Sequence, residues 1–217
     1  MEKFILNFIK SLFSARFKSF FKKYRRFNAI NKLDQKMLSY INYRNGFYIE
    51  CGANDGINQS NTWYFEKYLN WRGVLVEPNY NVFEQLKKNR SKKNIFINKA
   101  LVSSSYKKKK IPLVSNNLYS KINLSYYSKK NIIYAPTITL DKIFEEKKIQ
   151  KDVDFFSLDV EGYEMNVLNG INFKKYIIRN LLIETSNFSK VYLLLKKNNY
   201  RFVKKMSPHD YLFSRLT

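Results

Sequence analysis

Acidic residues follow several apolar runs of this chain, at positions where strands would end. Glu50 and Glu77 close the runs "FYIE" and "VLVE". Asp159 and Glu161 close "DFFSLDVE", and Glu184 closes "NLLIE". In an open α/β sheet, ligands bind outside the carboxyl ends of the parallel strands. Carboxylates gathered there could bind hydroxyl or ammonium groups, or accept a proton from a reacting group. We therefore predict that these five acids surround a ligand site.

A glycine-containing loop follows the first of these runs. In "FYIECGANDGINQSNTWYFE", Gly52 and Gly56 bracket Asn54 and Asp55, although the whole chain has only 6 glycines. Glycine allows a sharp turn or the close approach of a ligand. A strand, such a loop and then a helix is the arrangement with which α/β folds build nucleotide sites.

The loop lacks the Gly-x-Gly-x-x-Gly spacing and carries an acid, Asp55. A carboxylate there would repel a pyrophosphate but suit a cationic or hydroxyl-bearing ligand. S-adenosylmethionine, with a ribose, an ammonium and a sulfonium but no phosphate, fits this loop better than NAD. Glu77 follows at about the spacing at which dinucleotide folds place the acid that binds ribose hydroxyls.

Strands and helices are expected to alternate from residue 47 onward, which predicts a mostly parallel sheet with helices on both faces. The expected strands cover residues 47–51, 74–78, 94–102, 153–164 and 177–186. The expected helices cover residues 61–70, 79–90, 139–149, 165–170 and 190–198. Asn79 or Asn81 and Thr139 are candidate N-caps. Residues 200–206 and 210–216 are predicted to form a terminal antiparallel pair, and the polar stretch 103–135 a hairpin or excursion near the site.

Composition indicates one folded domain with a sizeable core. The chain has 217 residues, of which 45% are hydrophobic and 17% aromatic. With one cysteine and one histidine, it has no intramolecular disulfide and no His-rich metal site. A reducing, cytoplasmic setting is therefore the expectation.

The chain is strongly basic, with 40 Lys+Arg against 17 Asp+Glu and a net charge of +23. Such a balance is typical of proteins that meet phosphate-bearing partners such as nucleic acid or anionic lipid. The alternative is a compositional bias, because the basic residues are spread along the whole chain. The run Lys107–Lys110 is typical of a solvated loop tip.

Residues 1–40 differ from the rest, so we divide the chain into a basic helical segment (1–40) and a catalytic domain (41–217). Aromatic and aliphatic residues recur there at helical spacing, with lysines and arginines between them. No apolar run reaches the length of about 18 residues that a membrane span needs. Residues 1–27 could lie in an anionic membrane surface, which would make the protein peripheral, or pack against the domain.

Three stretches carry a resemblance to a known family: "IECGANDGINQSNTWYFEKYLNWRGVLVEPN", "TITLDKIF" and "DFFSLDVEGYEMNVLNG". They resemble, in order and spacing, the motifs of FkbM-type S-adenosylmethionine-dependent methyltransferases, as does the terminal "HDYLFSR". The resemblance runs from about Gly46 to the C-terminus. It implies a class I methyltransferase fold and O-methylation, often of sugar or polyketide-type hydroxyls.

The resemblance also implies roles for individual residues. Gly52, Asn54, Asp55 and Ser60 would surround the methionine end of the cofactor. Glu77 would bind the ribose hydroxyls, and Asp159 and Glu161 would face the methyl group and the acceptor. The full cofactor-binding set expected here is Glu50, Gly52, Ala53, Asn54, Asp55, Gly56, Ser60, Glu77, Pro78, Ala100, Leu101 and Asp159, with Ala100 and Leu101 beside the adenine.

Methyl transfer is an in-line displacement, so alignment of the reacting atoms contributes much of the catalysis. A base would help a sugar hydroxyl to attack, and Asp159, Glu161 and Glu184 are the candidates. Acids this close together would raise one another's pKa. They could instead hold a divalent cation such as Mg²⁺, although no dedicated metal ligand set is predicted. His209 is an alternative base, but it is more typical of a terminal hairpin residue.

Two rival functions follow from the basic character of the chain. An RNA methyltransferase would need an RNA-binding module or a basic stripe on one face, and the sequence shows neither. A non-enzymatic protein of the membrane surface would need only the N-terminal segment, and the acids at the strand ends argue against it. We therefore expect an O-methyltransferase that acts on a sugar or another small hydroxyl-bearing molecule.

Overall fold

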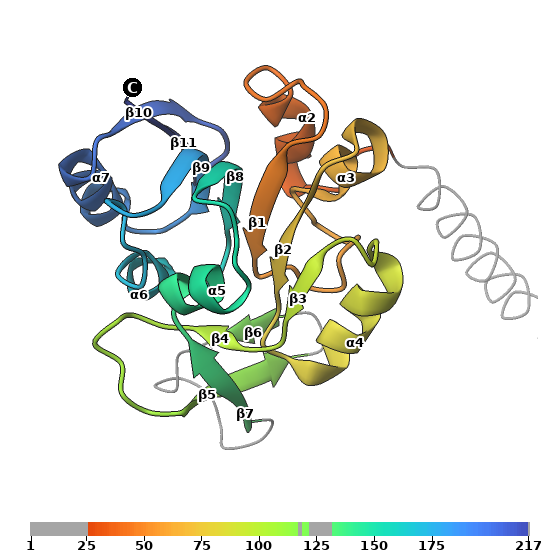
Figure 1. Ribbon diagram of the computed structural model, residues 1–217, viewed down its shortest axis with the longest axis vertical. Coiled ribbons are helices and arrows are strands. Elements are labelled where there is room, and N and C mark those ends of the chain that lie inside the picture. The colour runs from red at the N-terminus through yellow and green to blue at the C-terminus, as the bar shows by residue number, and fades with distance from the viewer. Residues whose placement is uncertain (1–25, 117–118, 122–131, 217) are drawn as a thin grey trace, which may run out of the picture.

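The computed structural model describes residues 26–116, 119–121 and 132–216 (Figure 1). The predicted membrane-surface segment, residues 1–27, lies almost wholly outside the described residues. None of the helices in the described ranges is long and apolar enough to cross a membrane. The described part of the chain begins to pack before residue 41, because Leu33 and Met37 are buried in the core.

The main sheet has seven strands in the order β10-β11-β9-β8-β1-β2-β3. Their bounds are β1 Phe47–Cys51, β2 Arg72–Val76, β3 Ile95–Ile97, β8 Asp152–Leu158, β9 Ile177–Glu184, β10 Tyr200–Lys205 and β11 Asp210–Arg215. The pairs from β3 across to β9 are parallel, whereas β11 runs antiparallel to both β9 and β10. This confirms the predicted class I methyltransferase arrangement, with its mostly parallel sheet and terminal antiparallel pair.

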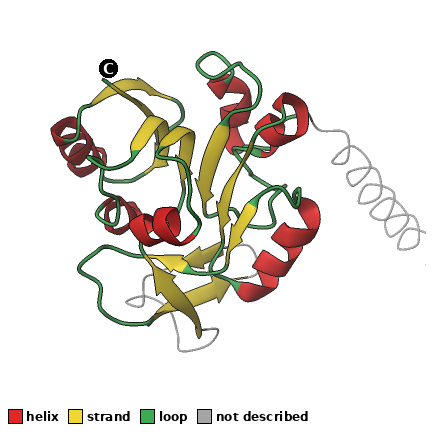
Figure 2. Cartoon of the chain, viewed as in Figure 1, coloured by secondary structure: helices red, strands yellow, loops and turns green. Residues whose placement is uncertain are grey.

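Helices cover both faces of this sheet (Figure 2). On one face α2 (Leu33–Met37), α3 (Trp63–Leu69) and α4 (Tyr80–Asn89) contribute to one buried cluster. On the other, α5 (Leu140–Glu146), α6 (Glu164–Leu168) and α7 (Phe188–Lys197) contribute to a second. Side chains of a strand alternate between its two faces, so in β1 Ile49 and Cys51 join one cluster and Tyr48 the other. Burial on both faces explains why the central strand β1 is buried along its whole length and why β2 is buried after Arg72.

The helix starts expected from the sequence are confirmed at two positions. The Asn79 side chain accepts a hydrogen bond from the backbone N–H of Asn81 at the start of α4. Thr139 does the same for the N–H of Lys142 at the start of α5. Each cap satisfies one of the backbone donors that a helix start leaves without a partner, and so defines where the helix begins.

A second, four-stranded sheet stands beside the main one, in the order β4-β7-β5-β6. It contains β4 (Ala100–Leu101), β5 (Lys110–Asn116), β6 (Tyr119–Lys121) and β7 (Ile132–Ile138). Antiparallel pairing of β5 with β6 and β7 confirms the predicted hairpin within residues 103–135. The single strand predicted over 94–102 is wrong. The chain leaves the main sheet at Asn98, whose side-chain amide donates to the carbonyls of Glu77 and Pro78, and β4 joins the second sheet instead.

The segment after β8 also departs from the expected extended chain. β8 ends at Leu158, and Glu161 (φ 55°) and Gly162 (φ 95°) both adopt left-handed backbone conformations. The backbone N–H of Gly162 donates to Glu164 Oε1 at 2.7 Å, which closes the turn. Strand alternation therefore does not orient Asp159 and Glu161; this turn does.

The turn after β1 depends on Gly52 more strictly than the turn after β8 depends on Gly162. Both have positive φ, but a Cβ on Gly52 would lie 1.8 Å from the backbone oxygen of Asp159, whereas a Cβ on Gly162 would meet nothing within 4 Å. Gly162→Ala should therefore cost only the backbone strain, about 1–3 kcal/mol of unfolding free energy. Gly52→Ala should cost more than about 4 kcal/mol, because two main chains would have to separate. Urea titration of both variants tests this, and equal losses would contradict it.

Candidate functional site

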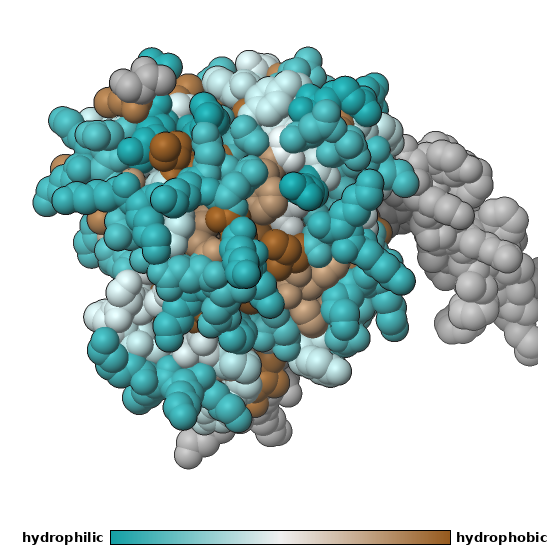
Figure 3. All heavy atoms as spheres, viewed as in Figure 1, coloured by the Kyte–Doolittle hydropathy of each residue, from teal (hydrophilic) through white to brown (hydrophobic). Residues whose placement is uncertain are grey.

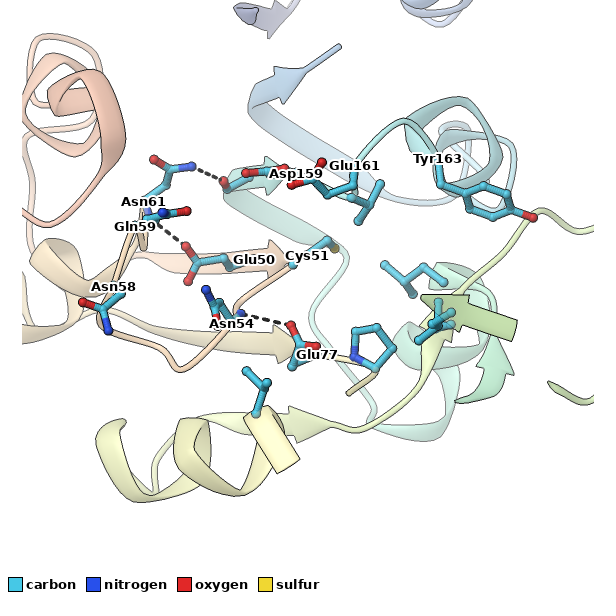
Figure 4. Close-up of a pocket in the computed structure, with 18 residues that line it drawn as sticks. Glu50, Cys51, Asn54, Asn58, Gln59, Asn61, Glu77, Asp159, Glu161 and Tyr163 are labelled. Atoms are coloured by element: carbon cyan, nitrogen blue, oxygen red, sulfur yellow. Dashed lines mark hydrogen bonds between the residues drawn. The ribbon is translucent and has the colours of Figure 1, made fainter. Parts of the chain in front are cut away.

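A pocket opens at the carboxyl ends of β1, β2 and β8 and extends to the second sheet (Figure 4). Its lining comes from the strand ends, the loop after β1, the turn after β8 and the strands β4 and β5. The 18 lining residues are Glu50, Cys51, Gly52, Asn54, Asn58, Gln59, Asn61, Glu77, Pro78, Val82, Ala100, Leu101, Leu113, Ser157, Asp159, Val160, Glu161 and Tyr163.

Four of these lining residues are acids, and none is a lysine, arginine or histidine. That contrasts with the chain as a whole, which has 40 Lys+Arg and a net charge of +23. The face of the molecule drawn in Figure 3 is mostly hydrophilic, as expected for a chain whose basic side chains reach into solvent. Among the described residues, the lining of the pocket therefore presents carboxylates and amides to a ligand and offers no cation to a phosphate.

Glu77 stands directly after β2 with 6% of its surface exposed. Its carboxylate accepts the backbone N–H of Asn54 at 3.1 Å and that of Asn79 at 2.9 Å. Burial raises the pKa of Glu77 to about 7, and these two hydrogen bonds only partly oppose the effect. In Figure 4 the carboxylate of Glu77 lies beside Asn54 at the end of β2.

Glu50 also lines the pocket, but its carboxylate oxygens are already hydrogen-bonded to the loop. Oε1 accepts the backbone N–H of Asn61 at 2.7 Å, and Oε2 accepts the hydroxyl of Thr62 at 2.6 Å. The Ser60 hydroxyl lies 3.0 Å from both oxygens, and Arg90 Nη1 lies 3.4 Å from Oε2. Glu50 therefore shapes the loop as well as lining the pocket.

Four residues of the expected cofactor set do not line the pocket: Ala53, Asp55, Gly56 and Ser60. Asp55 Oδ1 accepts the backbone N–H groups of Ile57 and Asn58, and Ser60 Oγ accepts those of Thr62 and Trp63. Both side chains hold turns of the loop. The other eight line the pocket as expected: Glu50, Gly52, Asn54, Glu77, Pro78, Ala100, Leu101 and Asp159.

The three candidate bases divide between two neighbouring hollows. Asp159 and Glu161 line the pocket, while Glu184 lines an adjacent recess that shares Glu161 and includes Glu164, Thr185, Ser186 and His209. Burial raises the pKa of Asp159 well above its usual range, and a hydrogen bond to Glu184 and the neighbouring acids raise it further. For Asp159, this confirms the expectation that neighbouring acids raise the pKa.

Several lining residues were not predicted from the sequence. Asn58, Gln59 and Asn61 lie just beyond Gly56. Three amide side chains so close to the glycine loop could have indicated, from the sequence alone, that this stretch lines the pocket. Cys51, Ser157 and Val160 flank predicted acids. The apolar wall formed by Val82, Leu113 and Tyr163 comes from α4, β5 and the turn after β8. Nothing in the sequence marks those three residues, because only the fold brings their elements together.

Within the described residues, no group of three or more His, Cys, Asp or Glu side chains is arranged to hold a metal ion. The divalent cation considered for Asp159, Glu161 and Glu184 gains no support from this geometry.

Comparison with protein families gives a match to the methyltransferase FkbM domain over residues 50–202. The match covers more than half of the chain and includes both the loop after β1 and the turn after β8. The chain belongs to the FkbM methyltransferase family. This confirms the resemblance drawn from the three motifs. A comparison with curated proteins gave no match.

The solved structures that resemble this chain do so at low identity. An FkbM methyltransferase from Methylobacillus flagellatus KT has 15% identity and a TM-score of 0.48, over 79% of this chain and 43% of that one. TYW2 from M. jannaschii, solved in complex with AdoMet, has 13% identity and a TM-score of 0.43, over 86% and 76% of the two chains. A precorrin-6y C5,15-methyltransferase from Geobacter metallireducens GS-15 has 8% identity and a TM-score of 0.45, over 85% of each chain. The chain thus spans less than half of the M. flagellatus protein, and similarities at this level carry no conclusion about the substrate.

The buried carboxyl of Glu77 predicts a pH dependence of stability. Its pKa is 4.5 in the unfolded reference and about 7 in the folded protein, so the folded state binds the proton more tightly. Stability should therefore fall as pH rises from 4.5 toward 7, by about 3 kcal/mol at most from this group. Glu77→Gln should abolish this contribution, so the unfolding free energy of the variant should decrease less than that of the wild type between pH 4.5 and 7.

Urea titrations of wild type and variant across this pH range provide the measurement. Glu146→Gln, on the exposed side of α5, is the matched control because it removes a carboxyl that is in water. A Glu77→Gln profile parallel to that of the wild type would contradict the prediction.

Proposed function

We propose that this chain is an S-adenosylmethionine-dependent O-methyltransferase that acts on a hydroxyl of a sugar or related small molecule. The observation that carries the proposal is the charge of the pocket, with four acids and no basic side chain in its lining. Bound there, the cofactor supplies an electrophilic methyl group on a sulfonium. Its ribose and ammonium groups suit carboxylates and amides, and it brings no phosphate that would need a cation.

The residues of the pocket suggest how the donor is held. Glu77, fixed by the N–H groups of Asn54 and Asn79, is placed to accept hydrogen bonds from both ribose hydroxyls. Gly52 leaves the backbone free of a side chain where β1 meets the end of β8. Ala100, Leu101 and Leu113 form an apolar wall suited to the adenine ring. Asn54, Asn58 and Gln59 lie along the loop and suit the methionine end.

The acceptor is assigned to the side of Asp159 and Glu161, where the pocket meets the adjacent recess. Glu161 lines both hollows, so its carboxylate is the one placed between donor and acceptor. We assign Glu161 as the base for the hydroxyl proton. Asp159, which is hydrogen-bonded to Glu184 and has a raised pKa, is assigned to the side nearer the donor.

The same charges favour a neutral acceptor over RNA. Beside Glu161, the recess is lined by Gly162, Glu164, Glu184, Thr185, Ser186 and His209, so its described lining holds three carboxyl groups and one imidazole. A phosphate backbone entering it would meet several carboxylates at close range, a repulsion that distant lysines do not offset because salt screens them. A sugar hydroxyl is neutral, so the carboxylates do not repel it, and it can donate a hydrogen bond to them.

Two measurements on the full chain test the function. Calorimetry should show one bound S-adenosylmethionine. Methyl-labelled donor, incubated with lysate fractions, should label a glycan or a small hydroxyl-bearing product. Absence of donor binding would reject the enzyme, and label that appears only in RNA would reject the acceptor class.

Glu77→Ala should weaken donor binding by about a hundredfold or more. It removes two charge-assisted hydrogen bonds of about 1.5–3 kcal/mol each. Calorimetry with methylthioadenosine, which keeps the ribose but lacks the methionine end, should show a similar loss. A folded variant with unchanged Kd would reject the role of Glu77, and a loss confined to the full donor would move Glu77 to the methionine end.

Glu161→Gln should leave donor affinity nearly unchanged and lower turnover by about 10²–10⁴, the usual contribution of a positioned base. The amide keeps the shape of the carboxylate but cannot take the proton. The measurement is the donor Kd and the rate of methyl transfer for one preparation, with Glu146→Gln as the surface control. Near-normal turnover would remove Glu161 from the mechanism, and loss of donor binding would reassign it to the donor.

A further inference from the structure

Arg90 ends α4, and its side chain is fully buried beneath the loop that follows β1. Nε donates to Glu66 Oε2 at 2.8 Å, and Nη2 donates to the Tyr48 hydroxyl at 2.7 Å. These two partners belong to α3 and β1. The guanidinium is therefore tied to the rigid part of the fold.

The same guanidinium also contacts the loop at three positions. Nη1 donates to the carbonyl of Gly56 and to Ser60 Oγ, both at 3.1 Å, and Nη2 donates to Thr62 Oγ1 at 3.0 Å. A Cβ on Gly56 would lie 2.7 Å from Arg90 Cγ, so the loop rests directly on this side chain. Glu50 adds its own hydrogen bonds to Ser60, Asn61 and Thr62 from the end of β1.

Residues of this loop line the pocket, whereas Arg90 and the loop residues Ser60 and Thr62 that it contacts do not. Asn58, Gln59 and Asn61 line the pocket. Ser60 and Thr62, which contact Arg90, are their neighbours in the chain. A shift of Ser60 and Thr62 would move the amides without removing any atom that touches the ligand.

We propose that Arg90 is a positioning residue, which holds the loop 56–62 in the shape that binds the methyl donor. Its planar fork of five N–H groups reaches β1, α3 and three loop positions at once. A lysine ammonium, with three donors at one point, cannot reproduce that set. The proposal depends on the proposed function only in naming S-adenosylmethionine as the ligand of the pocket.

The direct test is Arg90→Lys in the full chain. It keeps the buried positive charge beside Glu50 and Glu66 but loses the fork. Donor Kd should rise by about tenfold or more, equivalent to about 1.4 kcal/mol. The turnover rate at saturating donor should change much less. A folded variant with unchanged Kd would overturn the proposal.

A matched pair of variants separates positioning from general stability. Tyr48→Phe and Thr62→Val each remove one buried hydroxyl that contacts Arg90 Nη2, the first on the rigid side and the second on the loop side. Neither residue lines the pocket. Thr62→Val should raise donor Kd severalfold more than Tyr48→Phe at a similar loss of melting temperature. Equal effects of the two substitutions on donor Kd would overturn the proposal. If Arg90→Lys does not fold, this pair of variants provides the test.

Hydrogen exchange distinguishes failure of this proposal from failure of the proposed function. In the absence of any ligand, Arg90→Lys and Thr62→Val should speed exchange of the loop amides 57–62 relative to those of β1. Faster loop exchange without donor binding by the wild type would support the positioning role and reject the donor. Unchanged loop exchange would reject the positioning role whatever the protein binds.

Discussion

The buried contact between Arg90 and the carboxylates of Glu50 and Glu66 is the constraint on which the rest of the site depends. Removing either partner from a buried ion pair typically costs about 3–5 kcal/mol, because a charge is left in the interior without compensation. Here the partners belong to β1, α3 and the end of α4, so one guanidinium joins three elements at a single point. The loop that lines the pocket lies on that point. The hydrogen bonds that hold the loop therefore come in part from a guanidinium that does not line the pocket.

The pocket and the molecular surface differ in charge because different physical terms act on them. Lysines such as Lys107–Lys110 are mostly exposed and keep their ammonium groups in water, so they add to the net charge of +23 at little cost. The acids at the strand ends are buried or half-buried, and each meets backbone N–H groups, hydroxyls or another acid. Burial raises the pKa values of Glu77 and Asp159, so the negative charge of these two groups is less stable in the pocket than it would be in water. The net charge of the chain therefore does not predict the charge of the pocket, because exposed lysines set the first and buried acids set the second.

Much of the main sheet follows from the sequence, because both its faces are buried and its strands are apolar runs with clear ends. Phe47–Cys51 has the predicted bounds, and Asn79 and Thr139 cap the helices as expected. The break at Asn98 could not be predicted in this way. Residues 94–102 are apolar enough for one strand, and the break depends on hydrogen bonds from Asn98 to carbonyls about twenty residues earlier in the chain. Contacts between distant segments leave no local pattern in the sequence.

The sequence by itself determined the family, the fold class and the acids of the strand ends, because those depend on local patterns: apolar runs, a glycine loop and the residues that follow each strand. Only the tertiary structure decided what each acid does. Glu77 is buried at the wall of the pocket with two backbone donors, Glu50 is occupied by the loop, and Glu161 is turned by a left-handed backbone into the space between two hollows. Arg90 reads in the sequence as one more basic residue at the end of a helix. Its place at the centre of the site comes from the packing of α4 against β1, because a guanidinium enters the core only where neighbouring elements supply acceptors for its N–H groups.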